Sequence, residues 1–251
     1  LDLIREISDG LVTIKINLGS YLLLFEDPLY RNALFSSLQI AAISTLLCLL
    51  LGYPMAYAIA RSPALWRLSL LMLIILPFWT SFLIRVYAWI GILKGNGLLN
   101  NFLLWLGAID QPLVIMHTPI AVYIGIVYSY LPFVVLPLYA TLVRLDHSLL
   151  EAAADLGCPP WRQFLLITLP LSLPGVLAGG MLVFIPVMGE FVIPDLLGGP
   201  DTLMLGKLHW IEFFNNKDWP LASSLAAILL LVLIVPFALL RHFERKAEES
   251  G

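Results

Sequence analysis

The sequence has little charge. Of its 251 residues, 12% are charged and 60% are hydrophobic, and the mean hydropathy is +0.93. A soluble domain carries about 25% charged residues, so this composition excludes an ordinary soluble protein. Sparse charge together with long apolar runs is typical of a polytopic α-helical membrane protein.

Cysteine and histidine are also scarce. Cys48 lies in an apolar run and Cys158 in a polar loop, so the two are expected at different levels and do not predict a disulfide. The four histidines have no spacing typical of a metal site. The sequence contains no H-E-x-x-H or G-x-S-x-G motif. These absences weigh against an intramembrane enzyme, and we predict that the chain has no catalytic site.

Five apolar runs are each long enough to cross a bilayer, which needs about 20 residues. The runs cover residues 34–60, 68–93, 120–143, 164–186 and 221–240. They are too long and too continuously apolar for barrel strands. We predict an extracytoplasmic segment over 1–33 with little structure of its own, one transmembrane domain over 34–241, and a cytoplasmic tail over 242–251.

Lys and Arg in short loops mark the cytoplasmic side of a membrane protein. Arginines flank the predicted loops 61–67 and 144–163, and three basic residues follow the last span. We therefore predict that these loops face the cytoplasm and that 94–119 and 187–220 face outside. Residue 1 then lies outside, and cytoplasmic placement of both ends would require a sixth span upstream of Leu1.

The predicted outer side carries six basic and eleven acidic residues. Such a surface attracts cations. The alternative is that acidic residues collect there without a function, because they contribute little to membrane orientation.

The loop between the third and fourth runs carries a short helix with its own start and stop signals. Ser148 and Glu151 have the spacing of a capping box. The three alanines that follow favour a helix with a flat face, and Gly157 is suited to a left-handed stop. We predict a docking helix over 148–157; in the alternative, Glu151 only caps the helix and Gly157 only ends it.

The same loop carries a longer motif, E-A-A-x3-G-x9-I-x-L-P. This motif resembles the signature loop of binding-protein-dependent ABC importer permeases, and the match is complete. The matching residues are Glu151, Ala152, Ala153, Gly157, Ile167, Leu169 and Pro170. The resemblance implies that this loop is a coupling helix, which docks on a separate ATP-hydrolysing subunit.

Other segments extend the resemblance over nearly the whole chain. L-G-Y-P-M-A-Y-A-I-A, L-P-F-W-T-S-F-L-I-R-V-Y-A-W and G-E-F-V-I-P-D-L-L-G-G-P are similar to polyamine-importer permeases. The similarity is greatest to the putrescine type, with the spermidine type close behind. It implies an all-α bundle of the type I ABC importer permease class, multi-pass in a bacterial inner membrane. It also implies six spans, of which the missing one would be N-terminal.

The resemblance further implies a set of partners. They are a second, different permease subunit, two ATPase subunits, a periplasmic polyamine-binding protein and membrane lipids; nucleic acid is not among them. The chain itself needs no cofactor, because ATP and Mg would bind to the partner ATPase. The implied function is alternating-access import of a polyamine, with putrescine expected. A permease for another small solute, or a stand-alone secondary transporter or channel, remains open at this point.

Arg85 is a charge inside an otherwise apolar run. Intramembrane charges are costly and usually face a bundle interior or a cavity. One interpretation is a gate or a partner for a carboxylate on the substrate path. The other is a structural role, either as a packing ion pair or as a side chain that snorkels to the outer edge.

Glu190 ends the fourth run, and Asp195 follows close behind. A diamine needs a carboxylate at an ammonium group and aromatic faces along its methylenes. We therefore place Glu190 on the substrate path, with pairing to Arg85 or exposure to solvent as alternatives, and Asp195 as the next candidate. The aromatic candidates, each of which could instead belong to an interfacial belt, are Phe191, Trp79, Tyr87, Trp89, Tyr128 and Tyr130.

Overall fold

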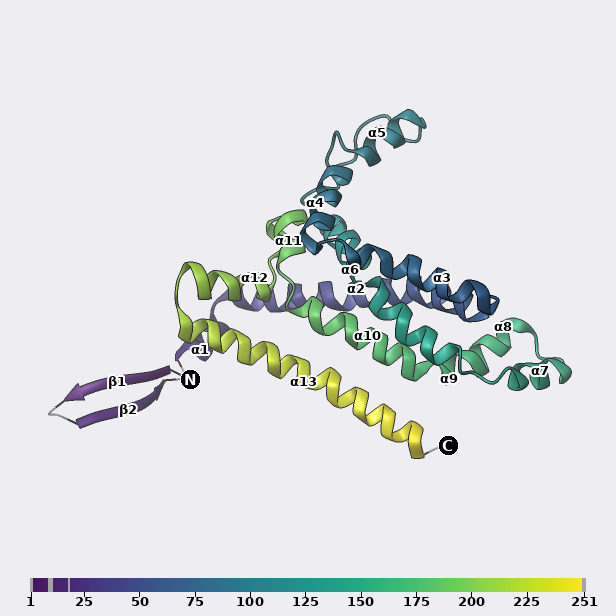
Figure 1. Ribbon diagram of the computed structural model, residues 1–251. Helices are drawn as coiled ribbons and strands as arrows, with labels where there is room; N and C mark the ends of the chain where they lie inside the picture. The colour runs from purple at the N-terminus through teal and green to yellow at the C-terminus, as the bar shows by residue number, and fades with distance from the viewer. Residues whose placement is uncertain (1, 9–10, 18, 250–251) are drawn as a thin grey trace.

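The computed structural model describes residues 2–8, 11–17 and 19–249, and the side-chain packing of 19–234. Three helices pack on one another and form the centre of a helical bundle (Figure 1). They are α2 (Pro28–Arg61), α6 (Pro119–Leu142) and α10 (Leu173–Met188). The predicted all-α fold is confirmed in this bundle.

The remaining helices are shorter, except for the last. They are α1 (Gly19–Glu26), α3 (Ala64–Ile75), α4 (Phe82–Leu93), α5 (Leu98–Trp105), α7 (His147–Asp155), α8 (Pro160–Gln163), α9 (Leu169–Leu171), α11 (Val192–Leu197), α12 (Leu205–Trp210) and α13 (Trp219–Glu249). In Figure 1, α7 and α8 lie at one end of the bundle and α1 and α12 at the other, while α4 and α5 project to one side.

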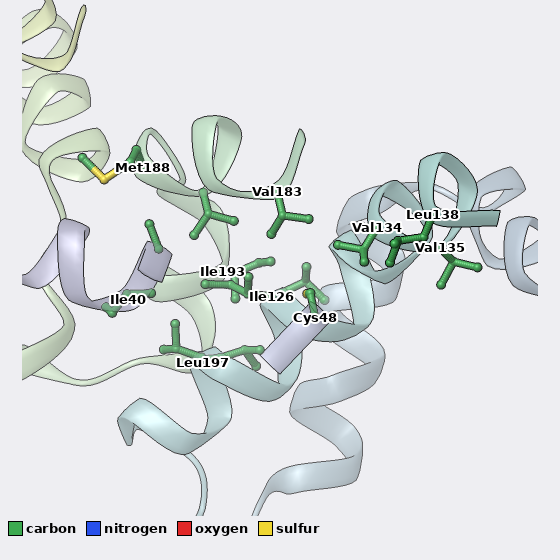
Figure 2. Close-up of a cluster of buried hydrophobic side chains, with 14 of the residues drawn as sticks. Ile40, Cys48, Ile126, Val134, Val135, Leu138, Val183, Met188, Ile193 and Leu197 are labelled. Carbon is green, nitrogen blue, oxygen red and sulfur yellow. The ribbon is translucent and has the colours of Figure 1, made fainter. Parts of the chain in front are cut away.

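The core consists of buried aliphatic side chains from α2, α6, α10 and α11 (Figure 2). It contains Ile40, Cys48, Ile126, Val134, Val135, Leu138, Val183, Met188, Ile193 and Leu197. The short helix α11 therefore returns into the bundle and contributes to the same core as the long helices.

Glycines set the spacing of the central helices. A Cβ atom on Gly179 would lie 3.1 Å from the Cα of Val134, and one on Gly175 would lie 2.6 Å from the Oγ1 of Thr141. Helices approach this closely in membranes only where small residues face the contact. Gly175 and Gly179, one helical turn apart, therefore lie at the closest approach of α10 to α6.

Gly179→Ala is expected to destabilise the fold, because the added methyl group meets backbone atoms of α6. Overpacking of this kind costs about 1–3 kcal/mol. Gly180→Ala is the matched control, since its Cβ would meet only Leu49 and Thr45 side chains at 3.7 Å. Thermal unfolding of the purified variants should show a lower midpoint for Gly179→Ala. Equal midpoints would contradict the close contact of α10 with α6.

The predicted span 68–93 is not one helix. Its helical part begins at Ala64, and a 3₁₀ turn over Leu76–Trp79 separates α3 from α4. Thr80 is extended, with φ −90° and ψ 152°, and its hydroxyl donates to the carbonyl of Pro77. Pro77 removes a backbone donor, so the break follows from a residue that a hydropathy profile does not distinguish.

The predicted span 164–186 is bent. A π-helical segment, Phe164–Thr168, precedes α9, and Pro160–Leu171 meets Leu173–Met188 at 63°. Pro170 and Pro174 flank this bend, and each removes a backbone donor from the helix.

By length and composition, three helices in the described part of the chain could cross a membrane: Pro28–Arg61, Phe82–Trp105 and Pro119–Leu142. The bent pair would be a fourth, and Ala64–Trp79 and Trp219–Ile234 are shorter apolar helices. Two predicted spans thus coincide with single long helices, while 68–93 is divided and 221–240 lies within α13. The orientation of these helices across the membrane remains a prediction.

The segment 1–33 is more ordered than its sequence predicts. Strands β1 (Asp2–Ser8) and β2 (Leu11–Asn17) form an antiparallel hairpin with Asp2 opposite Asn17. Apolar and polar residues alternate in both strands, and Asp9-Gly10 is a strong hairpin signal. The prediction of little structure gave this alternation too little weight. The first long helix also begins at Pro28, six residues before the predicted span.

Candidate functional site

One candidate region is the loop that contains α7. Its start differs from the predicted capping box, because the N-cap is Asp146 rather than Ser148. The carboxylate of Asp146 accepts the backbone N–H of Ser148 at 2.9 Å. This hydrogen bond holds the pKa of Asp146 below its usual value, so the cap is present at neutral pH and is lost as the pH falls through that lowered pKa. Both residues are favourable N-caps, and the sequence spacing alone favoured the wrong one.

The end of α7 is the predicted one. Gly157 has a φ of +76°, and its N–H donates to Ala154 at 2.8 Å. The N–H of Cys158 donates to Ala153 at 2.9 Å. These two bonds form a Schellman motif, which needs a residue that tolerates positive φ at its centre.

α7 is an exposed helix with no buried residue. Leu149, Leu156 and Trp161 lie on the surface around it, and Leu156 is 88% exposed. Glu151 and Ala152 are exposed as well. An exposed apolar group of this kind marks a contact surface.

The second half of the motif is anchored to the bundle instead. Ile167 and Leu169 are half-buried. Just before them, the ring of Phe164 packs edge-on against Tyr53 and Tyr57 of α2, with ring centroids 5.5 and 5.9 Å apart. The loop thus combines an exposed helix with a segment that is packed on α2.

The other candidate region is the turn between α10 and α11, where Glu190 is buried. One carboxylate oxygen of Glu190 accepts the backbone N–H groups of Phe191, Val192 and Ile193, at 3.1, 2.9 and 3.4 Å. The other oxygen accepts the hydroxyl of Tyr130 at 2.5 Å. Glu190 therefore caps α11 and ties it to α6 in this conformation, and it is not exposed to solvent.

Arg85 does not pair with Glu190; a row of rings separates them. The Cζ of Arg85 lies 4.7 Å from the ring centroid of Phe78. Phe78 packs edge-on against Phe133 at 5.3 Å, and Phe133 lies 6.0 Å from the ring of Tyr130. The predicted alternative of an Arg85–Glu190 ion pair is thus wrong for this structure.

Asp195 forms an ion pair with Lys207 at 2.5 Å. The pair lies beside a cavity of about 430 Å³, which His117, Gly199 and Thr202 also line. Both partners are partly exposed, so the contact contributes little to stability. Asp195 is available to solvent-borne groups, unlike Glu190.

The predicted aromatic residues are not in one place. Trp89 and Tyr128 pack edge-on at 5.3 Å, while Trp79 and Tyr87 are exposed. Phe191 stacks on Trp210, with centroids 4.9 Å apart and planes at 15°.

Trp210 packs on Phe191, one of the candidate residues, and the sequence analysis did not include it. It lies 4.2 Å from the ring of Phe214, so Phe191, Trp210 and Phe214 form one aromatic stack. A π-helical segment over Ile211–Asn215 follows Trp210, and such segments are frequent at functional sites. The i, i+4 spacing of Trp210 and Phe214 is the only sequence signal for the stack.

No group of three or more His, Cys, Asp or Glu side chains is placed to hold a metal ion within the described residues.

Glu190→Ala is expected to destabilise the protein, because it leaves three amides and the Tyr130 hydroxyl without their acceptor. Each buried donor left unsatisfied costs about 1–3 kcal/mol. Glu190→Gln keeps an acceptor oxygen and is the matched control, with stability close to that of the unsubstituted protein. Thermal unfolding of both variants tests the cap. A stable Glu190→Gln protein that loses transport would instead place Glu190 on the substrate path.

Residues 49–249 match the family described as binding-protein-dependent transport system inner membrane component. The spermidine/putrescine transport system permease protein PotB of Escherichia coli is 46% identical over 226 residues, which cover 88% of this chain and 82% of that protein. The protein of the same name from Haemophilus influenzae is 40% identical over 237 residues. This alignment covers 93% of this chain and 82% of that protein.

The fold is also that of a solved transporter. A chain of the bacterial alginate ABC transporter, in complex with an alginate pentasaccharide-bound periplasmic protein, aligns with a TM-score of 0.71 at 20% identity. The alignment covers 92% of this chain and 84% of the other. The fold, the exposed α7 and the family match agree: this chain belongs to the binding-protein-dependent inner membrane permeases and is the membrane subunit of an ABC importer.

Proposed function

We propose that this subunit imports a polyamine across the bacterial inner membrane, with putrescine as the expected substrate. The observation that carries the substrate class is the 46% identity to a spermidine/putrescine permease over 88% of the chain. The mechanism is alternating access, driven by ATP hydrolysis in a separate subunit.

The geometry of α7 supports a separate ATPase. A helix that is capped at both ends by its own residues holds its shape without a partner. Its surface side chains, including Leu156, are free to enter a groove of the ATPase, and the adjoining segment transmits the movement through Phe164 to α2. A stand-alone transporter or channel has no use for such an element.

The aromatic stack supports a cationic substrate. Phe191, Trp210 and Phe214 pack on one another on the predicted outer side, and Trp210 and Phe214 are exposed. Acidic residues outnumber basic ones on that side. Ring faces attract organic ammonium groups, and a net negative surface raises their local concentration. Asp195 adds an accessible carboxylate.

The proposed complex contains a second permease subunit, two ATPase subunits that bind ATP and Mg, and a periplasmic polyamine-binding protein. A permease for another solute is the second candidate, because a chain of the alginate transporter shares this fold. The coupling motif carries no information on the solute.

Gly157→Val is expected to weaken coupling, since a β-branched residue is strained at positive φ. Gly157→Asn is the control, because Asn tolerates this conformation. Co-purification of the ATPase and the uptake rate should both fall for Gly157→Val at unchanged expression, while Gly157→Asn retains most of each. Normal uptake with normal ATPase stimulation in Gly157→Val would contradict the docking role of α7.

Trp210→Leu is expected to raise the substrate concentration needed for half-maximal uptake by roughly two- to thirtyfold, the range of one cation–π contact. Trp219→Leu is the control, because Trp219 is also exposed and is not one of the three rings of the stack. The measurement is uptake of radiolabelled putrescine in cells that lack other polyamine importers, with spermidine as competitor. Failure of the unsubstituted complex to take up either polyamine would refute the proposed substrate.

A further inference from the structure

The ion pair of Asp195 with Lys207 joins two short helices beside a cavity. Asp195 lies in α11 and Lys207 in α12, with Oδ1 and Nζ 2.5 Å apart. Both residues line the cavity of about 430 Å³, a volume within the range of small-molecule sites. Among the described residues, Lys207 is the only partner of the Asp195 carboxylate. The cavity therefore carries one acid, whose charge is met by one lysine.

Other contacts hold α12 in place without this ion pair. A Cβ atom on Gly206 would lie 2.3 Å from the carbonyl oxygen of Gly189, so α12 rests on the turn between α10 and α11. The N–H of Leu205 donates to the hydroxyl of Ser37 in α2 at 2.8 Å. A partly exposed ion pair adds little to stability. The ion pair is therefore not required for the packing of α12.

The two partners differ in how far they can move. Asp195 has a short side chain in the first turn of α11, so its carboxylate stays at the cavity wall. Lys207 carries its ammonium on a flexible four-carbon stem, and its side chain is 35% exposed, so the ammonium can move out into solvent. Departure of the lysine leaves the acid behind, and the cavity is then suited to a cation.

His117 lines the same cavity and is held by the chain that follows α11. Its N–H donates to the carbonyl of Leu197 at 2.9 Å, and its Nδ1 lies 3.2 Å from the carbonyl oxygen of Gly198. These contacts retain His117 at a φ of +60°, which is uncommon for a residue other than glycine. We assign the proton to Nδ1, because the carbonyl can only accept. A neutral His117 adds no charge to the cavity.

The lysine side chain is itself a primary alkylammonium. It has the chemistry of one end of a linear polyamine, a protonated amine on a methylene chain. A carboxylate that accepts this group from Lys207 can accept it from such a ligand. The exchange leaves the total charge of the pair unchanged and replaces only a weak contact. The excess of acidic residues on the predicted outer side raises the local concentration of organic cations.

We infer that Asp195 is the ammonium acceptor of a polyamine site in this cavity, and that Lys207 is a tethered competitor which occupies the acceptor until the substrate displaces it. This inference rests on the proposed function, which supplies the polyamine. It adds the place where the polyamine binds on the outer side and the residue that limits its affinity there.

The test is binding of radiolabelled putrescine to the purified complex, without the binding protein. Lys207→Met keeps an unbranched side chain and removes the ammonium, so the dissociation constant should fall by roughly two- to fivefold, the range of an exposed ion pair. Asp195→Asn removes the acceptor charge and should raise the dissociation constant. Lys94→Met is the matched control, because Lys94 is exposed on the same predicted side and does not line the cavity. It should bind putrescine as the unsubstituted complex does.

The double variant separates competition from a general effect of charge. If Lys207 acts only by occupying Asp195, Lys207→Met should gain nothing in a protein that already carries Asp195→Asn. A gain of the same size in both backgrounds would overturn the inference. An unchanged dissociation constant in the single Lys207→Met variant would overturn it as well.

A second measurement reports the position of the ligand. Leu203 lines the cavity, and Leu203→Cys in a Cys158→Ser protein places a thiol there, while Cys48 is buried. Putrescine should slow the reaction of this thiol with a cationic thiol reagent, but not that of Asn96→Cys, whose residue is exposed in another loop. Equal rates with and without putrescine at Leu203→Cys, in a complex that still imports putrescine, would overturn the inference and leave the proposed function intact. Absence of putrescine and spermidine uptake by the unsubstituted complex would refute the proposed function and the inference with it.

Discussion

The close packing of α10 on α6 is the constraint on which the rest of this subunit depends. Apolar lipid gives no hydrophobic drive to helix association, so the contact depends on backbone approach at Gly175 and Gly179. Both candidate regions adjoin the ends of α10 in the chain. At one end the chain comes from α7, α8 and α9; at the other it turns at Glu190 into α11. A displacement of either end would therefore act on the same contact, that of α10 with α6.

The second constraint is that buried backbone N–H and C=O groups need hydrogen-bond partners. Where α10 stops and α11 begins inside the bundle, three N–H groups would be left without acceptors, and the Glu190 carboxylate meets all three. In the sequence, an acid at the end of an apolar run is equally consistent with a helix cap and with a substrate ligand. Only the geometry shows that, in this conformation, both of its oxygens are occupied.

Sequence reasoning succeeded where one residue type has one physical use. Gly157 was predicted as a left-handed stop, and it has a φ of +76°.

Sequence reasoning failed where several residues compete: Asp146 and Ser148 are both good caps, and the choice depends on where the chain leaves α6. Pro77 divides a run that hydropathy treats as continuous. The stack at Trp210 joins two segments outside every predicted span, so no periodicity could bring them together.

The groups that this chain leaves unsatisfied lie at separate places. Leu156 and its neighbours on α7 are apolar side chains in a polar loop, which an aqueous partner must cover. Arg85 is the reverse case: its guanidinium lies on the rings of Phe78 and Phe82, and its Nε and Nη1 atoms have no acceptor among the described residues. Each is costly in its own medium. Their persistence on different surfaces is the physical reason to regard the single chain as one part of an assembly.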